Sequence, residues 1–285
     1  DAPLDILQHL MIGSEGTLGF ISEITYDTVP DPRHKAAALV FYESPRAAAD
    51  AVIALRDAPV AALELIDRAG IRSAEGKPNM PAFLAELGSE ATALLVEVQA
   101  SSAEGLASSL RTTEAIIDGL PTLRPAQFST DPEVCAGYWA VRKGLFPAVG
   151  ALRETGTTVI IEDVAFPVEH LGQGITDLQA VFRRHGYDDA ILFGHARDGN
   201  LHIVFSQDFR SEAEVGRYAR FMDEFCELVV EGYQGSLKAE HGTGRNVAPF
   251  VELEWGRDAL LLMRRIKSLF DPEGILNPDR KSTRL

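Results

Sequence analysis

The sequence is poor in cysteine and in long apolar runs, and each shortage excludes a class of protein. Its 285 residues include only two cysteines, Cys135 and Cys226, which are far apart along the chain. Neither a disulfide framework nor a cysteine-rich iron–sulfur or zinc site can form within it, and we expect a reducing compartment, the cytoplasm. No apolar stretch approaches the roughly 20 residues of a membrane span.

The sequence also lacks a basic cluster. It has 27 Lys and Arg residues against 42 Asp and Glu residues, a formal net charge of −15, and no block of basic residues. This balance argues against nucleic acid as a partner, because such proteins need a basic footprint. A small anionic substrate is compatible with it, since one arginine in a pocket is enough. The hydrophobic share of 46% and charged share of 24% are typical of a globular protein.

Apolar periodicity predicts an α+β fold with a mostly antiparallel sheet and helices on one face. Before Pro30 we expect a short helix, a glycine-rich turn and an alternating strand, at residues 4–11, 13–19 and 20–26. Beyond it we expect strands at 37–42, 92–98, 158–166, 190–194 and 201–206. We expect helices from 45, and over 103–119, 168–186, 212–232 and 249–270. Residues 60–70 fit either a strand or a helix.

Two of the seven histidines frame a predicted hairpin. His195 and His202 flank Asp198-Gly199-Asn200, a strong turn signal that would aim both imidazoles at one point. Glu240 stands in a later loop that two glycines make tight. Two His and one carboxylate with an open position commonly hold catalytic zinc. The spacing alone equally fits histidines with a structural role.

Three further features have both a chemical and a structural interpretation. His241, beside Glu240, is a candidate general base or a residue that caps a loop. Arg142, in the run Tyr138–Lys143, is a candidate carboxylate clamp or a solvated residue of a helix with Trp139 in the core. The glycine-rich turn at 13–19 could present backbone N–H groups to a cofactor, or be only a turn.

Taken in order, five segments resemble one family. They are IGSEGTLGFISEIT, YWAVRK, FGHARDGNLHIVF, KAEHGTGR and IKSLFDPEGILNP. The chain resembles, over residues 1–278, the C-terminal portion of FAD-linked 2-hydroxyacid dehydrogenases. This group of vanillyl-alcohol-oxidase-type flavoproteins includes D-lactate dehydrogenase, the glycolate oxidase FAD subunit and D-2-hydroxyglutarate dehydrogenase. The sequence of these segments is most similar to that of long bacterial members that are fused to an iron–sulfur module.

The resemblance implies a domain plan. Residues 1–30 would be a C-terminal stub of the FAD-binding domain, and residues 31–270 a ferredoxin-like cap domain that binds substrate and metal, an antiparallel sheet covered by helices. Residues 271–278 would return to the FAD-binding domain. The last residues, 279–285, read DRKSTRL, which matches one reading frame of a common sequencing adapter. We interpret them as an assembly artefact.

The resemblance also assigns roles to residues. His195, His202 and Glu240 match the ligands of a divalent metal, usually zinc, although this ligand set does not separate zinc from manganese. His241 matches the base, Arg142 holds the substrate carboxylate, and Asn200 orients the hairpin or touches substrate. The remaining matches line the flavin, and they are Gly13, Ser14, Gly16, Thr17, Gly19, Ile24 and Asn277.

The implied activity is oxidation of a 2-hydroxy carboxylate of the lactate, glycolate or 2-hydroxyglutarate type, with hydride transfer to FAD. The electron acceptor or iron–sulfur module would lie outside this chain and could attach it peripherally to the inner membrane. Some members place a substrate-binding Lys where this chain has Glu162, which leaves the substrate open. Without the pyrophosphate-binding part of the FAD domain, we expect weak FAD binding and no activity. The alternatives are a stand-alone metal-dependent hydrolase and a non-catalytic binding module.

Overall fold

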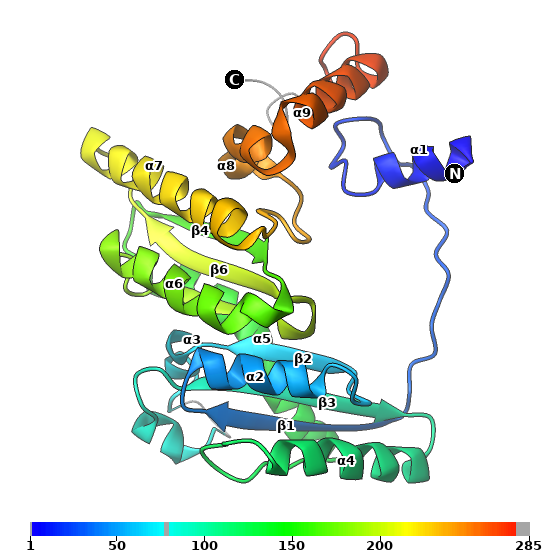
Figure 1. The fold of residues 1–285 in the computed structure, drawn as a ribbon, viewed down its shortest axis with the longest axis vertical. Helices are drawn as coiled ribbons and strands as arrows, with labels where there is room; N and C mark the ends of the chain where they lie inside the picture. Colours follow the sequence, from blue (N-terminus) through cyan, green and yellow to red (C-terminus); the bar gives the residue numbers. More distant parts are fainter. Residues whose placement is uncertain (1, 77–79, 278–285) are drawn as a thin grey trace.

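The computed structural model describes residues 2–76 and 80–277, and its centre is an antiparallel six-stranded sheet (Figure 1). The strand order is β1-β3-β2-β5-β6-β4. The strands are β1 (His34–Tyr42), β2 (Ala62–Ile66), β3 (Thr92–Ala100), β4 (Thr158–Ala165), β5 (Ile191–His195) and β6 (Asn200–Gln207). This confirms the predicted antiparallel α+β fold, and it resolves residues 62–66 as a strand. The residues interpreted as an adapter, 279–285, and Pro278 lie outside the described residues.

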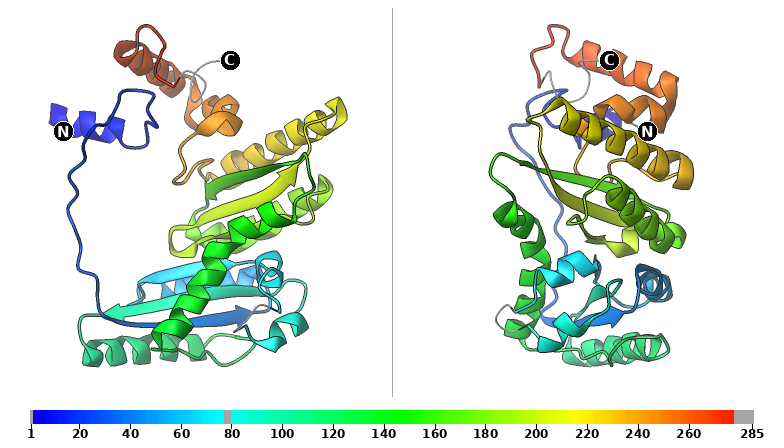
Figure 2. Two further views of the ribbon diagram at one scale, coloured as in Figure 1. Left: turned by 180° about the vertical axis from the view of Figure 1, so that it is seen from behind. Right: turned by 90° about the vertical axis from the view of Figure 1, so that its left-hand side faces the viewer.

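Helices cover both faces of this sheet, and not one face only as we expected. The main core lies between one face and α2 (Pro45–Leu55), α4 (Ala103–Asp118), α6 (Leu171–Arg184) and α7 (Glu212–Glu227). A smaller core lies on the opposite face, under α5 (Pro132–Leu152), α3 (Arg68–Arg72) and the short helix η1 (Ala82–Glu86). Figure 2 shows α5 running across the back of the strands.

Strand alternation decides which residues share the α5 face. Leu63 and Leu65 of β2, and Leu201 and Ile203 of β6, pack into the main core. Because successive side chains of a strand point to opposite faces, the residues between them project toward α5. The polar residues on that face include Glu64, Glu97, Asp163, His195 and His202.

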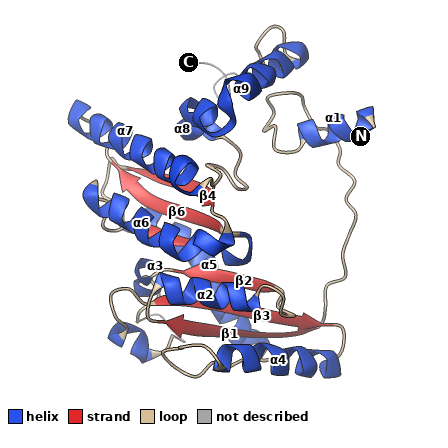
Figure 3. Cartoon of the chain, viewed as in Figure 1, coloured by secondary structure: helices blue, strands red, loops and turns tan. Residues whose placement is uncertain are grey.

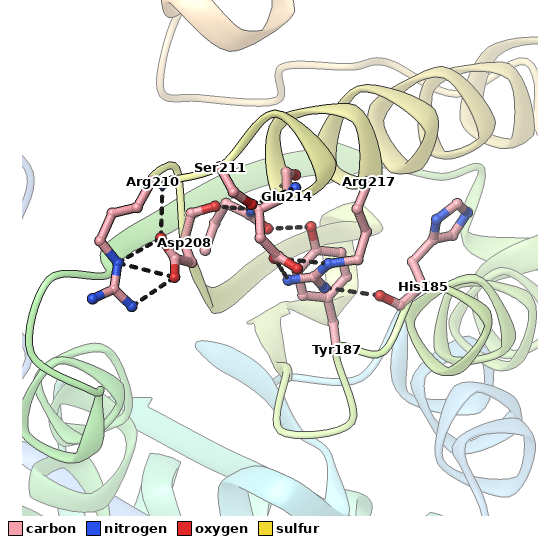
Figure 4. A network of polar contacts seen from close by, with 8 residues as sticks. His185, Tyr187, Asp208, Arg210, Ser211, Glu214 and Arg217 are labelled. Carbon is pink, nitrogen blue, oxygen red and sulfur yellow. Dashed lines mark hydrogen bonds and ion pairs between the residues drawn. The ribbon is translucent and has the colours of Figure 1, made fainter.

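Local capping explains where the helices begin. Ser44 accepts a hydrogen bond from Ala47 N at 3.3 Å and precedes Pro45 in the first turn, as the sequence predicts. Ser211 caps α7 in the same way (Figure 4). Nearby, Arg217 of α7 donates to the carbonyl of His185 at 2.9 Å and lies over the ring of Tyr187. These contacts tie the start of α7 to the loop that joins α6 to β5. Figure 3 shows α6 and α7 lying side by side on one face of the sheet.

The segment that follows α7 returns to the edge of the sheet. The chain passes through the π-helical turn η4 (Leu228–Gly232) and then pairs Ser236 with Ala165, the last residue of β4, through two backbone hydrogen bonds of 2.9 and 3.0 Å. Residues 238–241 therefore begin at the edge of the sheet, next to β4.

The N-terminal segment differs from the expectation in one element. Helix α1 (Pro3–Met11) forms as predicted, but residues 20–26 are extended chain with no assigned strand. Phe20 is 89% exposed and Tyr26 is 76% exposed. An alternating pattern needs a hydrogen-bonding neighbour to become a strand, and no described residue supplies one here.

The remaining elements lie beside this N-terminal segment (Figure 1). They are α8 (Gly244–Val247), η5 (Ala248–Phe250) and α9 (Val251–Phe270). Two short helices lie elsewhere in the fold: η2 (Val168–His170) precedes α6, and η3 (Ala196–Asp198) joins β5 to β6. Lys267 of α9 donates to the carbonyl of Thr17 at 2.8 Å and so ties α9 to the glycine-rich turn. None of the helices in the described ranges is long and apolar enough to cross a membrane.

The turn between β5 and β6 requires glycine at position 199, and this requirement can be tested. Gly199 has φ +68°, and a Cβ there would lie 2.0 Å from the carbonyl oxygen of Phe166. Gly199→Ala should therefore lower the free energy of unfolding by more than about 1 kcal/mol, measured by chemical denaturation. Gly88→Ala is the control, because a Cβ there meets no atom within 4 Å, and it should stay within about 0.5 kcal/mol of the parent. Equal stability of the two variants would contradict this account of the turn.

Candidate functional site

Three side chains of the types that bind metal ions converge on the α5 face of the sheet. One ligand atom each from His195, His202 and Glu240 lies within 4.8 Å of the others. Glu240 Oε1 is 3.1 Å from His202 Nε2 and 3.6 Å from His195 Nε2. The structure thus brings together all three residues that the sequence proposed as ligands.

Sheet register explains the convergence. His195 ends β5 and lies opposite Glu64 of β2, while His202 of β6 lies between Phe193 and Asp163 on its two neighbouring strands. The tight turn η3 brings the chain from one histidine to the other, as the hairpin prediction requires.

A buried carboxylate on β4 anchors the loop that carries Glu240. Asp163 Oδ2 accepts a hydrogen bond from Glu240 N at 2.7 Å and another from His241 N at 3.4 Å. Lys238 Nζ lies 3.6 Å from the other carboxylate oxygen. These contacts hold the Glu240 side chain over the two histidines.

Burial and hydrogen bonding shift the pKa values of the two imidazoles in opposite directions. Burial, more than any neighbouring charge, lowers the pKa of His202 to about 4, so this imidazole is neutral at pH 7 and keeps a lone pair. The hydrogen bond between Glu64 Oε1 and His195 Nδ1, 2.7 Å long, raises the pKa of His195. Because a carboxylate only accepts, Nδ1 carries the hydrogen and Nε2 faces Glu240. Two imidazoles and a carboxylate with this orientation fit a divalent cation.

His241 lies directly beside the three ligand candidates. Its ring stacks on His202 with centroids 4.9 Å apart, and its Nδ1 is 3.5 Å from Asp163 Oδ1. Its Nε2 is 3.5 Å from Glu240 Oε1, and 38% of its side chain is exposed. This position suits either a base next to the metal or a further ligand.

Arg142 reaches the same face from α5. Its Nε donates to Glu64 Oε2 at 2.8 Å, its guanidinium carbon lies 4.4 Å from the centre of the Phe193 ring, and only 11% of its side chain is exposed. The alternative of a solvated arginine is therefore wrong. Trp139, one turn earlier, donates to Glu97 at 2.6 Å instead of contacting the ligand candidates.

Two polar residues singled out in the sequence lie elsewhere. Asn200 is buried, and its side-chain amide is 3.5 Å from the carbonyl of Val164, so it contacts β4, the strand beside the hairpin. Glu162 faces away from the histidines, where Lys238 and Asn246 donate to it. The position that raised doubt about the substrate therefore does not border the three ligand candidates.

The proposed flavin-lining residues gather at one turn, with one exception. Ser14 and Thr17 are buried, and the Asn277 side chain donates to the carbonyl of Glu15 at 2.7 Å. Gly13, Gly16 and Gly19 belong to the same turn. Ile24 lies apart, in the extended segment, and is 54% exposed.

This turn touches the loop of Glu240 and His241. Gly242 has φ +70°, and a Cβ there would lie 2.4 Å from Glu15 Oε1. The glycine-rich turn and the histidine cluster, which are far apart in the sequence, are therefore adjacent in the fold.

The sequence analysis missed Glu64 and Asp163. Glu64 fell in the segment 60–70 that fitted two structures, and Asp163 stood beside Glu162, which attracted attention instead. Each is a buried carboxylate on a strand rich in apolar residues, and a buried carboxylate of this kind needs a specific partner. A carboxylate in such a strand could therefore have identified both residues, although it does not predict which residues they contact.

Residues 31–280 match the family described as "FAD linked oxidases, C-terminal domain". The chain belongs to this family. Curated relatives include the glycolate oxidase subunit GlcD of Bacillus subtilis, 32% identical over 96% of this chain and 56% of that protein. The mitochondrial D-lactate dehydrogenase [cytochrome] of Arabidopsis thaliana is 31% identical, over 96% of this chain and 47% of the relative. The D-2-hydroxyglutarate dehydrogenase of Stutzerimonas stutzeri is 25% identical, over 96% and 58%.

The chain thus spans about half the length of the curated relatives that it matches. Solved structures show the same fold. An alkyldihydroxyacetonephosphate synthase aligns with a TM-score of 0.62 at 16% identity, over 95% of this chain and 49% of the other. A 4-ethylphenol oxidase from Gulosibacter chungangensis aligns with a TM-score of 0.59 at 15% identity, over 87% and 54%. The predicted family and fold are therefore confirmed.

The ligand cluster predicts metal binding by this 285-residue chain. Loss of a residue behind a ligand weakens binding by about 10–100-fold, so loss of a ligand in His202→Ala should weaken Zn²⁺ binding by more than about 100-fold. Calorimetric titration measures this directly. His185→Ala is the matched control, because His185 pairs with Glu224 instead. Unchanged Zn²⁺ binding by His202→Ala would place the metal elsewhere.

Proposed function

We propose that this chain is the substrate- and metal-binding part of a flavin-dependent D-2-hydroxyacid dehydrogenase. The reaction would convert a 2-hydroxy carboxylate of the lactate, glycolate or 2-hydroxyglutarate type to the 2-oxo acid. The observation that supports this most strongly is the contact between Glu15 and Gly242, which puts the glycine-rich turn next to His241. A hydrolase would have no use for a flavin-lining turn at this point. The names of the curated relatives agree with this chemistry.

Each residue of the cluster has a distinct task in this proposal. His195, His202 and Glu240 would hold the divalent metal, with zinc as our first choice. When bound, the metal supplies Lewis acidity to the 2-hydroxyl group and FAD supplies the hydride acceptor. His241, exposed beside the ligands, takes the hydroxyl proton as general base.

Arg142 binds and orients the substrate carboxylate. Its Nε is already engaged with Glu64, so the two terminal nitrogens of the guanidinium are the ones left for a second carboxylate. The Phe193 ring beneath the guanidinium holds its plane. Asn200 steadies the hairpin through its contact with Val164 and does not touch the substrate in this proposal.

We also propose the division of the chain between two domains. Residues up to 30 would complete the FAD-binding domain, residues 31–270 would form the cap domain, and the segment from 271 would return to the FAD-binding domain. The contact of Asn277 with Glu15 supports this return. The flavin would lie against the turn at residues 13–19, and its electron acceptor would lie outside this chain.

A dye-reduction assay on the full-length parent protein, purified with FAD, tests the function. D-lactate, glycolate and D-2-hydroxyglutarate are the substrates, and D-3-hydroxybutyrate is the control because its hydroxyl group is one carbon further from the carboxylate. We expect reduction with at least one 2-hydroxyacid, loss of it on chelation, and none with the control. Ester hydrolysis that chelation abolishes, without any dye reduction, would support the metal-dependent hydrolase instead.

Removing the base should slow catalysis without removing the metal. In the full-length protein, His241→Asn should lower kcat by about 10²–10⁴-fold, the usual contribution of a general base. Metal content, measured by mass spectrometry of the purified variant, should equal that of the parent. Loss of the metal would instead show that His241 is a ligand.

Removing the arginine should weaken carboxylate binding. Arg142→Met in the full-length protein should raise KM for every 2-hydroxyacid that is oxidised, because no cation remains to meet the carboxylate. Lys143→Met, at an exposed neighbouring position of α5, is the control and should leave KM unchanged. An unchanged KM in Arg142→Met would remove this residue from the substrate site.

A further inference from the structure

Glu64 occupies a central position between two parts of the site. It lies on β2, in the middle of the sheet, and is only 4% exposed. Its Oε1 accepts from His195 Nδ1 at 2.7 Å, and its Oε2 accepts from Arg142 Nε at 2.8 Å. One buried carboxylate therefore contacts both a metal-ligand candidate and the candidate substrate clamp.

We propose that Glu64 is a positioning residue that fixes His195 for metal binding and Arg142 for substrate binding at the same time. This inference rests on the proposed function for the role of Arg142. It concerns the orientation of two side chains and gives Glu64 no contact with substrate.

The contact with His195 determines which ring nitrogen is available. Glu64 only accepts hydrogen bonds, so Nδ1 must carry a hydrogen and Nε2 keeps the lone pair for a metal. Nε2 is the atom that lies 3.6 Å from Glu240 Oε1. His202 differs, because its Nδ1 is buried with no hydrogen-bond partner in the described part of the chain. The orientation of His195 thus depends on Glu64 in a way that the orientation of His202 does not.

The contact with Arg142 determines where the guanidinium points. Engaging Nε with a buried carboxylate fixes the guanidinium plane and leaves the end of the group, formed by the two terminal nitrogens, available for a second carboxylate. Phe193 lies below that plane, so the side chain has little freedom to rotate away. Because Glu64 itself is held within a strand, the clamp and the ligand keep a fixed separation.

Glu97 is a natural control for this inference. It lies on β3, on the same face of the sheet, and is 8% exposed. It accepts from Trp139 at 2.6 Å and from Gln99 at 2.5 Å, and it has no contact with the histidines. A general effect of losing a buried carboxylate on this face should appear equally in variants of Glu97 and of Glu64.

The first test is Zn²⁺ titration of this chain by calorimetry. Glu64→Gln keeps the size of the side chain but replaces one acceptor oxygen with an NH₂ group, which must oppose an N–H of His195 or of Arg142. We expect Zn²⁺ binding to weaken by about 10–100-fold, the usual effect of losing a residue behind a metal ligand. Glu97→Gln should bind Zn²⁺ as the parent chain does. Equal affinity of Glu64→Gln and the parent would overturn the proposal.

A second pair of variants covers the possibility that Glu64→Gln does not fold. That substitution leaves Arg142 without its buried counter-charge, and Arg142→Met removes the problem. The double variant Glu64→Gln/Arg142→Met should bind Zn²⁺ about 10–100-fold more weakly than Arg142→Met alone. Equal affinities in this pair would also overturn the role of Glu64 behind His195.

The second readout is KM in the full-length protein. With Zn²⁺ held at a saturating concentration, so that weaker metal binding does not contribute, Glu64→Gln should raise KM for the 2-hydroxyacid as Arg142→Met does. The double variant should raise it no further, because both changes disable the same clamp. Additive effects on KM would contradict the positioning of Arg142 by Glu64. If the parent chain does not bind Zn²⁺, the proposed metal centre is wrong. If the parent binds Zn²⁺ but Glu64→Gln binds it equally well, only the role of Glu64 is wrong.

Discussion

The antiparallel pairing of β2 with β5 is the interaction on which the candidate site depends. It joins the strands β1, β3 and β2 to the strands β5, β6 and β4, through a register of only three residue pairs. One of these pairs is Glu64 with His195. A slip by one residue would put Glu64 and His195 on opposite faces of the sheet, so the same register that closes the sheet also aligns the site.

Buried carboxylates are costly, and here each has partners that offset the cost. Glu64 is shared by an arginine and a histidine, while Asp163 accepts two backbone N–H groups and lies near Lys238. Breaking a buried pair leaves an uncompensated charge, so these contacts hold their members in place. His202 shows the opposite effect, because its burial keeps the imidazole neutral and available as a ligand.

The site is assembled from separate parts of the chain that meet on one face of the sheet. The histidines come from the β5–β6 hairpin, Arg142 from the helix that crosses that face, and Glu240 from the loop that Asp163 anchors. The glycine-rich turn reaches the same loop through Glu15 and Gly242. The proposed function needs cofactor and substrate groups side by side, and this packing agrees with that proposal.

The hairpin with its two histidines and most helices and strands could be predicted from the residues alone, because caps, turns and periodicity are local properties. The other features depend on how distant segments pack. Glu64 meets His195 across 131 residues of chain, and Arg142 faces the site because α5 crosses that side of the sheet. No local pattern encodes such distant pairing. The alternating residues 20–26 show the same limit, because a strand forms only where a neighbouring strand accepts its hydrogen bonds.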